Sequence, residues 1–131
     1  MRKLKGWFIV LLISLSLFGM TACSDGGANS YEQITPQEAK TIMDTEKEYI
    51  IIDARTDEEF AEGHIADAIL IPEYEIAARA EKELPDKDAL VLVYCRSGRR
   101  SKIASEELVK LGYTNVKEFG GIIDWPYEIV K

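Results

Sequence analysis

The chain has 131 residues, 47% of them hydrophobic, which is enough for one domain and too few for several. Its formal net charge is −7, which argues against a protein that binds nucleic acid or anionic lipid head groups through a basic surface. We therefore expect no nucleic-acid partner.

The first 22 residues have the layout of a secretory signal peptide. A start with three basic residues precedes an apolar run from Trp7 to Phe18, and small residues follow before Cys23. The apolar run is shorter than the roughly 20 residues of a membrane-spanning helix, so we favour a cleaved signal over the alternative of an uncleaved anchor. Cleavage would make the remaining chain more acidic still, because the removed segment has no acidic residue.

The sequence MTAC, which ends at Cys23, resembles the lipobox of bacterial lipoproteins, although Met20 stands where leucine is usual. In such proteins the cysteine is lipidated and becomes the first residue of the mature chain. Residues 23–30 would then be a lipidated cysteine with a flexible tether of small, polar residues. The resemblance implies a domain over residues 31–131 that a lipid anchors to a membrane of the cell envelope, outside the cytoplasm.

Beyond the tether, short apolar runs alternate with segments of helical character. In chain order, we predict a helix over 35–44, a strand over 49–53, a helical turn over 56–63, a strand over 68–72, a helix over 73–84, a strand over 89–94, a helix over 101–112 and a strand over 115–119. Such alternation predicts an α/β domain with a mainly parallel sheet.

Capping residues support the expected helix boundaries. Thr35 is placed as an N-cap before Pro36 at the first helical position. Thr56 and Glu59 have the spacing of a capping box, in which each side chain bonds to the other residue's backbone N–H group. Gly112 is expected to end the helix over 101–112.

A cysteine surrounded by arginines follows the strand over 89–94, in the sequence CRSGRRS. In open α/β sheets, ligands bind beyond the carboxyl ends of the strands, and the free N–H groups of a helix N-terminus attract anions. The helix dipole and the arginines both favour a thiolate over a thiol, and glycine permits the positive φ that an anion cradle needs. We predict that Cys95 is an activated nucleophile in an anion-binding loop formed by Arg96, Ser97, Gly98, Arg99 and Arg100.

The length of this loop separates two chemistries that use such a cysteine. Cysteine-dependent phosphatases place the arginine that clamps the phosphate at the position of Ser101, whereas here the arginine comes one place earlier, at Arg100. A shorter loop suits one added sulfur atom and is crowded for a tetrahedral phosphate. Phosphatase or arsenate reductase activity is therefore the less favoured alternative.

Three stretches of the chain resemble the rhodanese family: 50–72, the active loop over 95–100, and 113–126 with its glycine pair and tryptophan. The resemblance covers residues 31–131 and implies a rhodanese-like α/β fold, with a mainly parallel sheet of about five strands and helices on both faces. Two residues depart from the family pattern, since Asp67 replaces a usual glycine and Leu70 a common asparagine. Both concern the shape of one turn rather than the active loop.

The resemblance also implies a sulfurtransferase activity. Cys95 would take a sulfane sulfur from a small anionic donor, thiosulfate or a persulfide, and pass it to a thiol acceptor or to cyanide. The amides of residues 96–100 would hold the persulfide, while Arg96, Arg99 and Arg100 would attract the donor or stabilise departing sulfite. Arg100 is also a candidate for a structural ion pair. The chemistry needs no cofactor and no metal.

Two further hypotheses remain open beside this one. The first is a non-catalytic binding or regulatory module, and the second is a carrier whose donor is a partner protein's persulfide. Four other residues with functional potential, His64, Asp53, Arg55 and Trp125, are expected to have structural roles.

Overall fold

The computed structural model describes residues 30–131. The predicted signal peptide over 1–22, the lipidation site Cys23 and the tether up to residue 29 lie outside the described residues. The domain boundaries that depend on them stay a prediction. Within residues 30–131, no helix combines the length and the hydrophobicity that crossing a bilayer requires.

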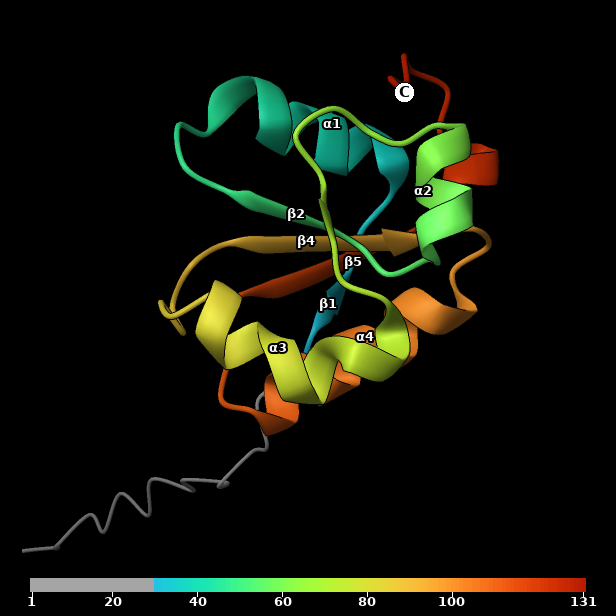
Figure 1. Cartoon of the computed structure of the whole chain (residues 1–131). Helices are drawn as coiled ribbons and strands as arrows, with labels where there is room; N and C mark the ends of the chain where they lie inside the picture. The colour runs from blue at the N-terminus through green and yellow to red at the C-terminus, as the bar shows by residue number, and fades with distance from the viewer. Residues whose placement is uncertain (1–29) are drawn as a thin grey trace, which may run out of the picture.

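Five parallel strands form one sheet, in the spatial order β1-β5-β4-β2-β3 (Figure 1). The strands are β1 (Glu32–Gln33), β2 (Ile50–Asp53), β3 (Ile69–Leu70), β4 (Val91–Cys95) and β5 (Val116–Gly121). The expected parallel α/β sheet is confirmed. No pattern predicted β1, because its two residues are polar and exposed and pair only with the edge of β5.

Helices cover both faces of the sheet, as expected. They are α1 (Pro36–Thr45), α2 (Asp57–Glu62), α3 (Ile76–Glu83) and α4 (Arg99–Lys110), with short 3₁₀ turns η1 (Glu73–Glu75) and η2 (Ile122–Asp124). Figure 1 shows α1 and α2 on one side of the sheet and α3 and α4 on the other. This arrangement buries both faces of the central strands, which explains why their sequences are apolar throughout.

Alternate residues of β4 enter two separate cores. Leu92 and Tyr94 pack into the core that includes Ala39 of α1. Val93 and Cys95 point the other way, into the core shared with α3 and α4. This two-residue period of a strand places the Cys95 sulfur on the side of the sheet that α4 covers.

The predicted helix over 101–112 begins two residues earlier than expected, at Arg99, and ends at Lys110. Gly98 precedes it with φ 105°, a left-handed conformation that costs glycine little. The loop after Cys95 is consequently shorter than predicted, and Arg99 and Arg100 belong to the first turn of α4.

Three smaller differences concern helix and strand ends. The predicted capping box of Thr56 is only half formed, because the Glu59 carboxylate accepts from the Thr56 hydroxyl and from Arg100 rather than from the Thr56 backbone. The strand predicted over 68–72 is limited to β3. Asp67 adopts φ 66° where the rhodanese pattern has glycine, so this turn keeps a left-handed residue despite the substitution.

Candidate active site

Cys95 ends β4 at the carboxyl edge of the sheet, directly before the N-terminus of α4. Its side chain is completely buried, and it is a free thiol. The Gly98 N–H group donates a hydrogen bond to Sγ over 3.0 Å. The loop therefore folds back over the sulfur and directs a backbone N–H group toward it, as an anion-binding loop does.

The segment at and just after the end of β5 contacts this loop. The Arg96 carbonyl accepts a hydrogen bond from the Ile123 N–H group over 3.2 Å. A Cβ atom on Gly121 would lie only 2.0 Å from the Arg96 carbonyl oxygen, so no other residue fits there. The glycine pair of the rhodanese pattern thus has a steric reason at Gly121.

The three arginines of the loop have different environments. Arg96 and Arg99 are exposed, and neither has an ion-pair partner among residues 30–131. Arg100 instead donates to both carboxylate oxygens of Glu59, over 2.7 and 2.9 Å, which fits the structural ion pair suggested for it. Two free guanidinium groups are therefore available to an incoming anion.

Two residues beside the sulfur were not identified as site residues from the sequence. The Ser101 hydroxyl oxygen lies 3.3 Å from Cys95 Sγ and 2.6 Å from Glu118 Oε1. Glu118, on β5, is 2% exposed. No local pattern points to it, because a lone glutamate in a strand normally faces solvent.

Known proteins share this fold and sequence pattern. Residues 35–126 match the family described as the rhodanese-like domain. The chain belongs to this family. It is 42% identical over 80 residues to thiosulfate sulfurtransferase PspE of Escherichia coli (strain K12), covering 61% of this chain and 77% of that relative. It is also 42% identical over 88 residues to a sulfurtransferase of Allochromatium vinosum, covering 66% and 79% of the two chains.

Solved structures agree with this assignment. A rhodanese with anions from E. coli superposes with a TM-score of 0.60 and 40% sequence identity, over 63% of this chain and 98% of that one. The rhodanese-like fold expected from the sequence is confirmed. Relatives with sulfurtransferase names support a transferase of that general class.

In this rhodanese-like protein, the residues expected to be structural do have structural contacts. Asp53 accepts from the Arg55 guanidinium and from the Tyr94 hydroxyl, and Arg55 also donates to the Gly63 carbonyl over 2.7 Å. His64 stacks on the Phe60 ring, with Nδ1 3.0 Å from the Phe60 carbonyl oxygen.

Trp125 packs against Phe119 and Tyr127, with ring centroids 5.5 and 4.9 Å apart. Its contacts are thus those of a packing residue, as expected. Within residues 30–131, no group of three or more His, Cys, Asp or Glu side chains is arranged to hold a metal ion.

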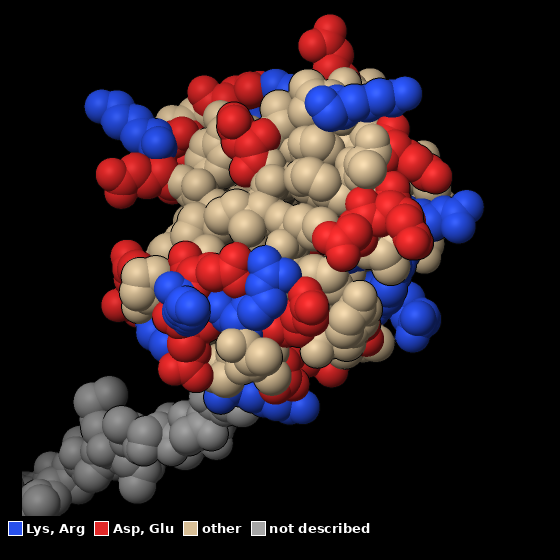
Figure 2. All heavy atoms as spheres, in the orientation of Figure 1, with Lys and Arg blue, Asp and Glu red and all other residues tan. Residues whose placement is uncertain are grey.

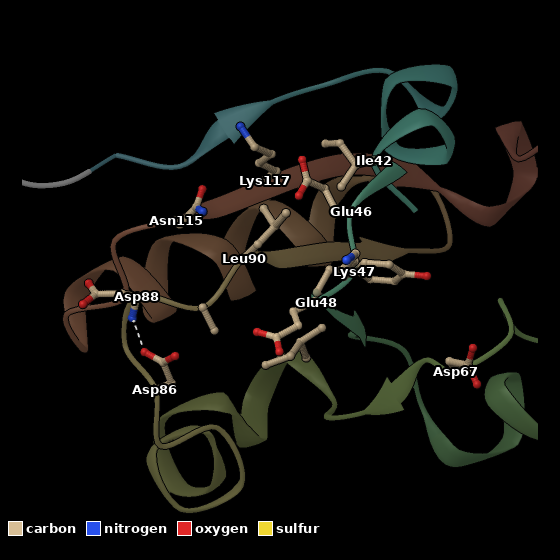
Figure 3. Close-up of a pocket in the computed structure, with 13 residues that line it drawn as sticks. Ile42, Glu46, Lys47, Glu48, Asp67, Asp86, Asp88, Leu90, Asn115 and Lys117 are labelled. Carbon is tan, nitrogen blue, oxygen red and sulfur yellow. Dashed lines mark hydrogen bonds between the residues drawn. The ribbon is translucent and has the colours of Figure 1, made fainter. Parts of the chain in front are cut away.

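A cavity of about 1010 Å³, shown in Figure 3, is lined by none of the residues 95–100. It is lined by residues before the first positions of β2, β4 and β5, among them Tyr49, Leu90 and Asn115, so it opens at the amino edge of the parallel sheet. A smaller cavity of about 320 Å³ lies beside the active loop and is lined by Ser97, Gly98 and Glu118. The candidate active site therefore lies at the edge of the sheet beside the smaller cavity, and not at the edge that holds the larger one.

Basic and acidic side chains are mixed over the remaining surface. On the face in Figure 2, basic side chains lie beside acidic ones rather than in one basic patch. Arg79 on α3, for example, bonds to Glu75 and Glu83. Among the arginines of residues 30–131, Arg96 and Arg99 are the two without an ion pair.

The ion pair between Glu59 and Arg100 should make stability depend on pH. Hydrogen bonds from Arg100 lower the pKa of Glu59 from 4.5 to about 2. A carboxyl group whose pKa is lowered by folding stabilises the folded state at pH values above its unfolded-state pKa. This stabilisation is lost as pH falls from about 4.5 to 2. Glu59→Gln should lower the free energy of unfolding at neutral pH by only about 1 kcal/mol, because the ion pair is partly exposed. It should also weaken the dependence of stability on pH in this range.

Urea unfolding of both proteins at several acidic pH values measures the effect. Glu58→Gln is the control, because Glu58 is exposed one position earlier on the same helix. Parallel pH profiles for Glu59→Gln and the unchanged protein would contradict the prediction.

Proposed function

We propose that this protein is a sulfurtransferase that carries a sulfane sulfur as a persulfide on Cys95. The observation that carries the proposal is the cradle around Sγ, with a backbone N–H group 3.0 Å away and a helix N-terminus directly behind it. These dipoles stabilise negative charge on sulfur before the reaction, which is what a thiolate nucleophile requires. The sulfurtransferase names of relatives support the same chemistry.

The donor is proposed to be a small anion, thiosulfate or a persulfide. The Cys95 thiolate attacks the outer sulfur of thiosulfate, a new S–S bond forms, and the donor's S–S bond breaks with its electron pair on sulfite. Arg96 and Arg99 would attract the doubly charged donor and stabilise the departing sulfite, since neither is neutralised by an ion pair in residues 30–131. A thiol or cyanide acceptor then removes the outer sulfur and leaves the Cys95 thiolate.

Burial of Cys95 adds one condition to this reaction. Because the side chain has no exposed surface, residues that cover Sγ must move before a donor can reach it. The segment 96–98 has exposed residues at positions 96 and 97 and is anchored by Gly98 and by the Arg96 carbonyl.

The direct test is the intact mass of the purified protein after brief exposure to thiosulfate, beside the Cys95→Ser variant. The unchanged protein should gain the mass of one sulfur atom and then form thiocyanate from cyanide, while Cys95→Ser should do neither. A sulfur adduct in both proteins would exclude Cys95 as the carrier. No adduct in either would exclude thiosulfate as the donor and direct the search to protein persulfides.

Steady-state kinetics test the role given to the free arginines. Arg99→Ala should raise the KM for thiosulfate by roughly tenfold, since a charge-assisted contact contributes about 1.5–3 kcal/mol. Lys110→Ala is the control, because Lys110 is exposed at the other end of α4. Unchanged thiosulfate kinetics in Arg99→Ala would remove this residue from the donor site.

We also propose that the protein is a lipoprotein of the cell envelope, anchored through Cys23. Support comes from the sequence alone, from the signal-like segment and the lipobox-like MTAC. Membrane fractions of cells fed a labelled fatty acid should contain labelled protein, and Cys23→Ser should lose the label. Equal labelling of both proteins would contradict lipidation at this residue.

A further inference from the structure

We propose that Glu118, acting through Ser101, exchanges a proton with Cys95, so that thiol and carboxyl group share one negative charge. The inference rests on the proposed role of Cys95 as the nucleophile. It adds a positioning residue from β5, a strand that is far from Cys95 in the sequence. Ser101 is the only bridge between the two groups that the described residues provide.

The hydrogen-bond geometry supports a continuous chain from sulfur to carboxylate. The Ser101 oxygen lies 2.6 Å from Glu118 Oε1 and 3.3 Å from Sγ. Two backbone carbonyls, of Gly98 and Gly120, are farther from it than the carboxylate, at 3.0 and 3.4 Å. A hydroxyl has one proton, so it donates to the nearest acceptor, Glu118, and accepts from the Cys95 thiol.

The same three groups remain satisfied when the proton moves. The thiol proton passes to the Ser101 oxygen while the hydroxyl proton passes to Glu118. The carboxylic acid then donates to Ser101, and Ser101 donates to the thiolate. No hydrogen bond is lost and the net charge is unchanged, so a thiolate forms without adding charge to a buried site.

Burial explains why one shared charge is favoured over two. Cys95 is 0% exposed and Glu118 is 2% exposed, and a thiolate beside a carboxylate would repel in such surroundings. The carboxylate is held by the Gly120 N–H group over 2.8 Å. Strongly interacting acids lose their protons as a pair, in two separated steps.

Other titratable and charged groups lie around the pair. They come from each neighbouring element, and are Tyr31 before β1, Arg100 and Lys102 on α4, Glu59 on α2, Glu73 in η1, Lys117 on β5 and Asp124 in η2. Arg100 is neutralised by Glu59, and Lys117 pairs with Glu32. None of them is hydrogen-bonded to Sγ in residues 30–131, whereas Ser101 is.

The proton balance fits sulfur transfer. While Cys95 attacks the donor as a thiolate, its proton stays on Glu118, and the persulfide carries its negative charge on the outer sulfur. When an acceptor takes that sulfur, Cys95 leaves as a thiolate and recovers the proton from Glu118. Neither half-reaction needs an outside proton donor.

The test is the pH dependence of Cys95 alkylation by iodoacetamide, from about pH 5 to pH 9, read on the Cys95 peptide by mass spectrometry. The unchanged protein should show two steps separated by a plateau. Glu118→Gln should show one step, and its rate at neutral pH should rise about tenfold, because the competing negative charge is gone. Glutamine keeps the acceptor for Ser101 and Gly120, so the fold should be preserved.

Two further variants complete the test. Ser101→Ala keeps both acidic groups but removes the hydroxyl that bridges them, so the alkylation rate on the plateau should change severalfold. Glu58→Gln, which removes an exposed charge on α2, should keep the unchanged two-step profile. A one-step profile in the unchanged protein, a two-step profile retained in Glu118→Gln, or an unchanged plateau rate in Ser101→Ala would overturn the proposal. Since alkylation requires no sulfur donor, this result does not depend on whether thiosulfate is a substrate.

Discussion

Asp53→Ala should destabilise the protein by about 3–5 kcal/mol, the loss typical of a buried ion pair from which one partner is removed. The Asp53 side chain is completely buried and the Arg55 side chain is 6% exposed. Asp53 accepts from the Arg55 side chain, with 2.7 Å to Nη2, and from the Tyr94 hydroxyl over 2.6 Å. Its removal leaves a buried guanidinium and a buried hydroxyl without their acceptor.

Asp53, Arg55 and Tyr94 form a buried polar cluster, and the size of this effect follows from its further contacts. Arg55 also donates to the Gly63 carbonyl, and the Tyr94 hydroxyl accepts from the Ile65 N–H group. Burial, together with the Asp53 charge, raises the pKa of Tyr94, which keeps it a donor. The cluster thus ties the ends of β2 and β4 to the turn after α2, next to the strand end that holds Cys95.

Urea unfolding measures this loss, with Glu75→Ala as the matched control. Glu75 pairs with Arg79 at similar distance, 2.7 Å, but both side chains are more than a third exposed, so its removal should change stability by less than about 1 kcal/mol. A domain of this size has only about 5–15 kcal/mol in total, so Asp53→Ala should remove about a fifth of it or more. Equal effects of the two variants would refute the cluster's importance.

Gly121→Ala should lower kcat/KM for sulfur transfer by roughly a hundredfold or more, because displacements of about 1 Å in an active site have effects of that order. The added Cβ would lie 2.0 Å from the Arg96 carbonyl oxygen and 2.5 Å from Ser97 Cα. Both contacts are with backbone, so the loop after Cys95 must move. The conformation of Gly121 itself, with φ −125°, is open to any residue, so the effect is steric.

Gly112→Ala is the informative control for this variant. A Cβ there meets no atom within 4 Å, but φ is 99°, so alanine should cost about 1 kcal/mol of stability through backbone strain. Sulfur transfer should stay near the unchanged rate in Gly112→Ala and fall in Gly121→Ala. Wild-type kinetics in a folded Gly121→Ala protein would show that the loop accommodates the methyl group.

Several features of the fold could be predicted because they depend on neighbours in sequence. The apolar runs at 49–53 and 89–94 predicted the two central strands, and Thr35 and Thr56 predicted helix starts. The position of Cys95, after a buried strand and before a helix, followed from the same local alternation.

Other features were missed or displaced because non-neighbouring segments determine them. Strand β1 exists only because β5 offers its edge. The carboxylate of Glu59 bonds to Arg100, 41 residues away, instead of completing a local capping box. The helix start at Arg99 depends on Gly98, whose N–H group is taken by the Cys95 sulfur.

The sequence by itself predicted the cysteine proposed as the nucleophile, and it determined its place at the end of a strand and the excess of arginines around it. Only the tertiary structure decided which arginines stay free, why Gly121 must be glycine, and that a buried Glu118 reaches Cys95 through Ser101. The reason is physical. The positions of helices and strands along a chain are set by local hydrogen bonds and by the spacing of apolar residues. Pairing between parallel strands instead brings together residues whose separation in the sequence follows no pattern.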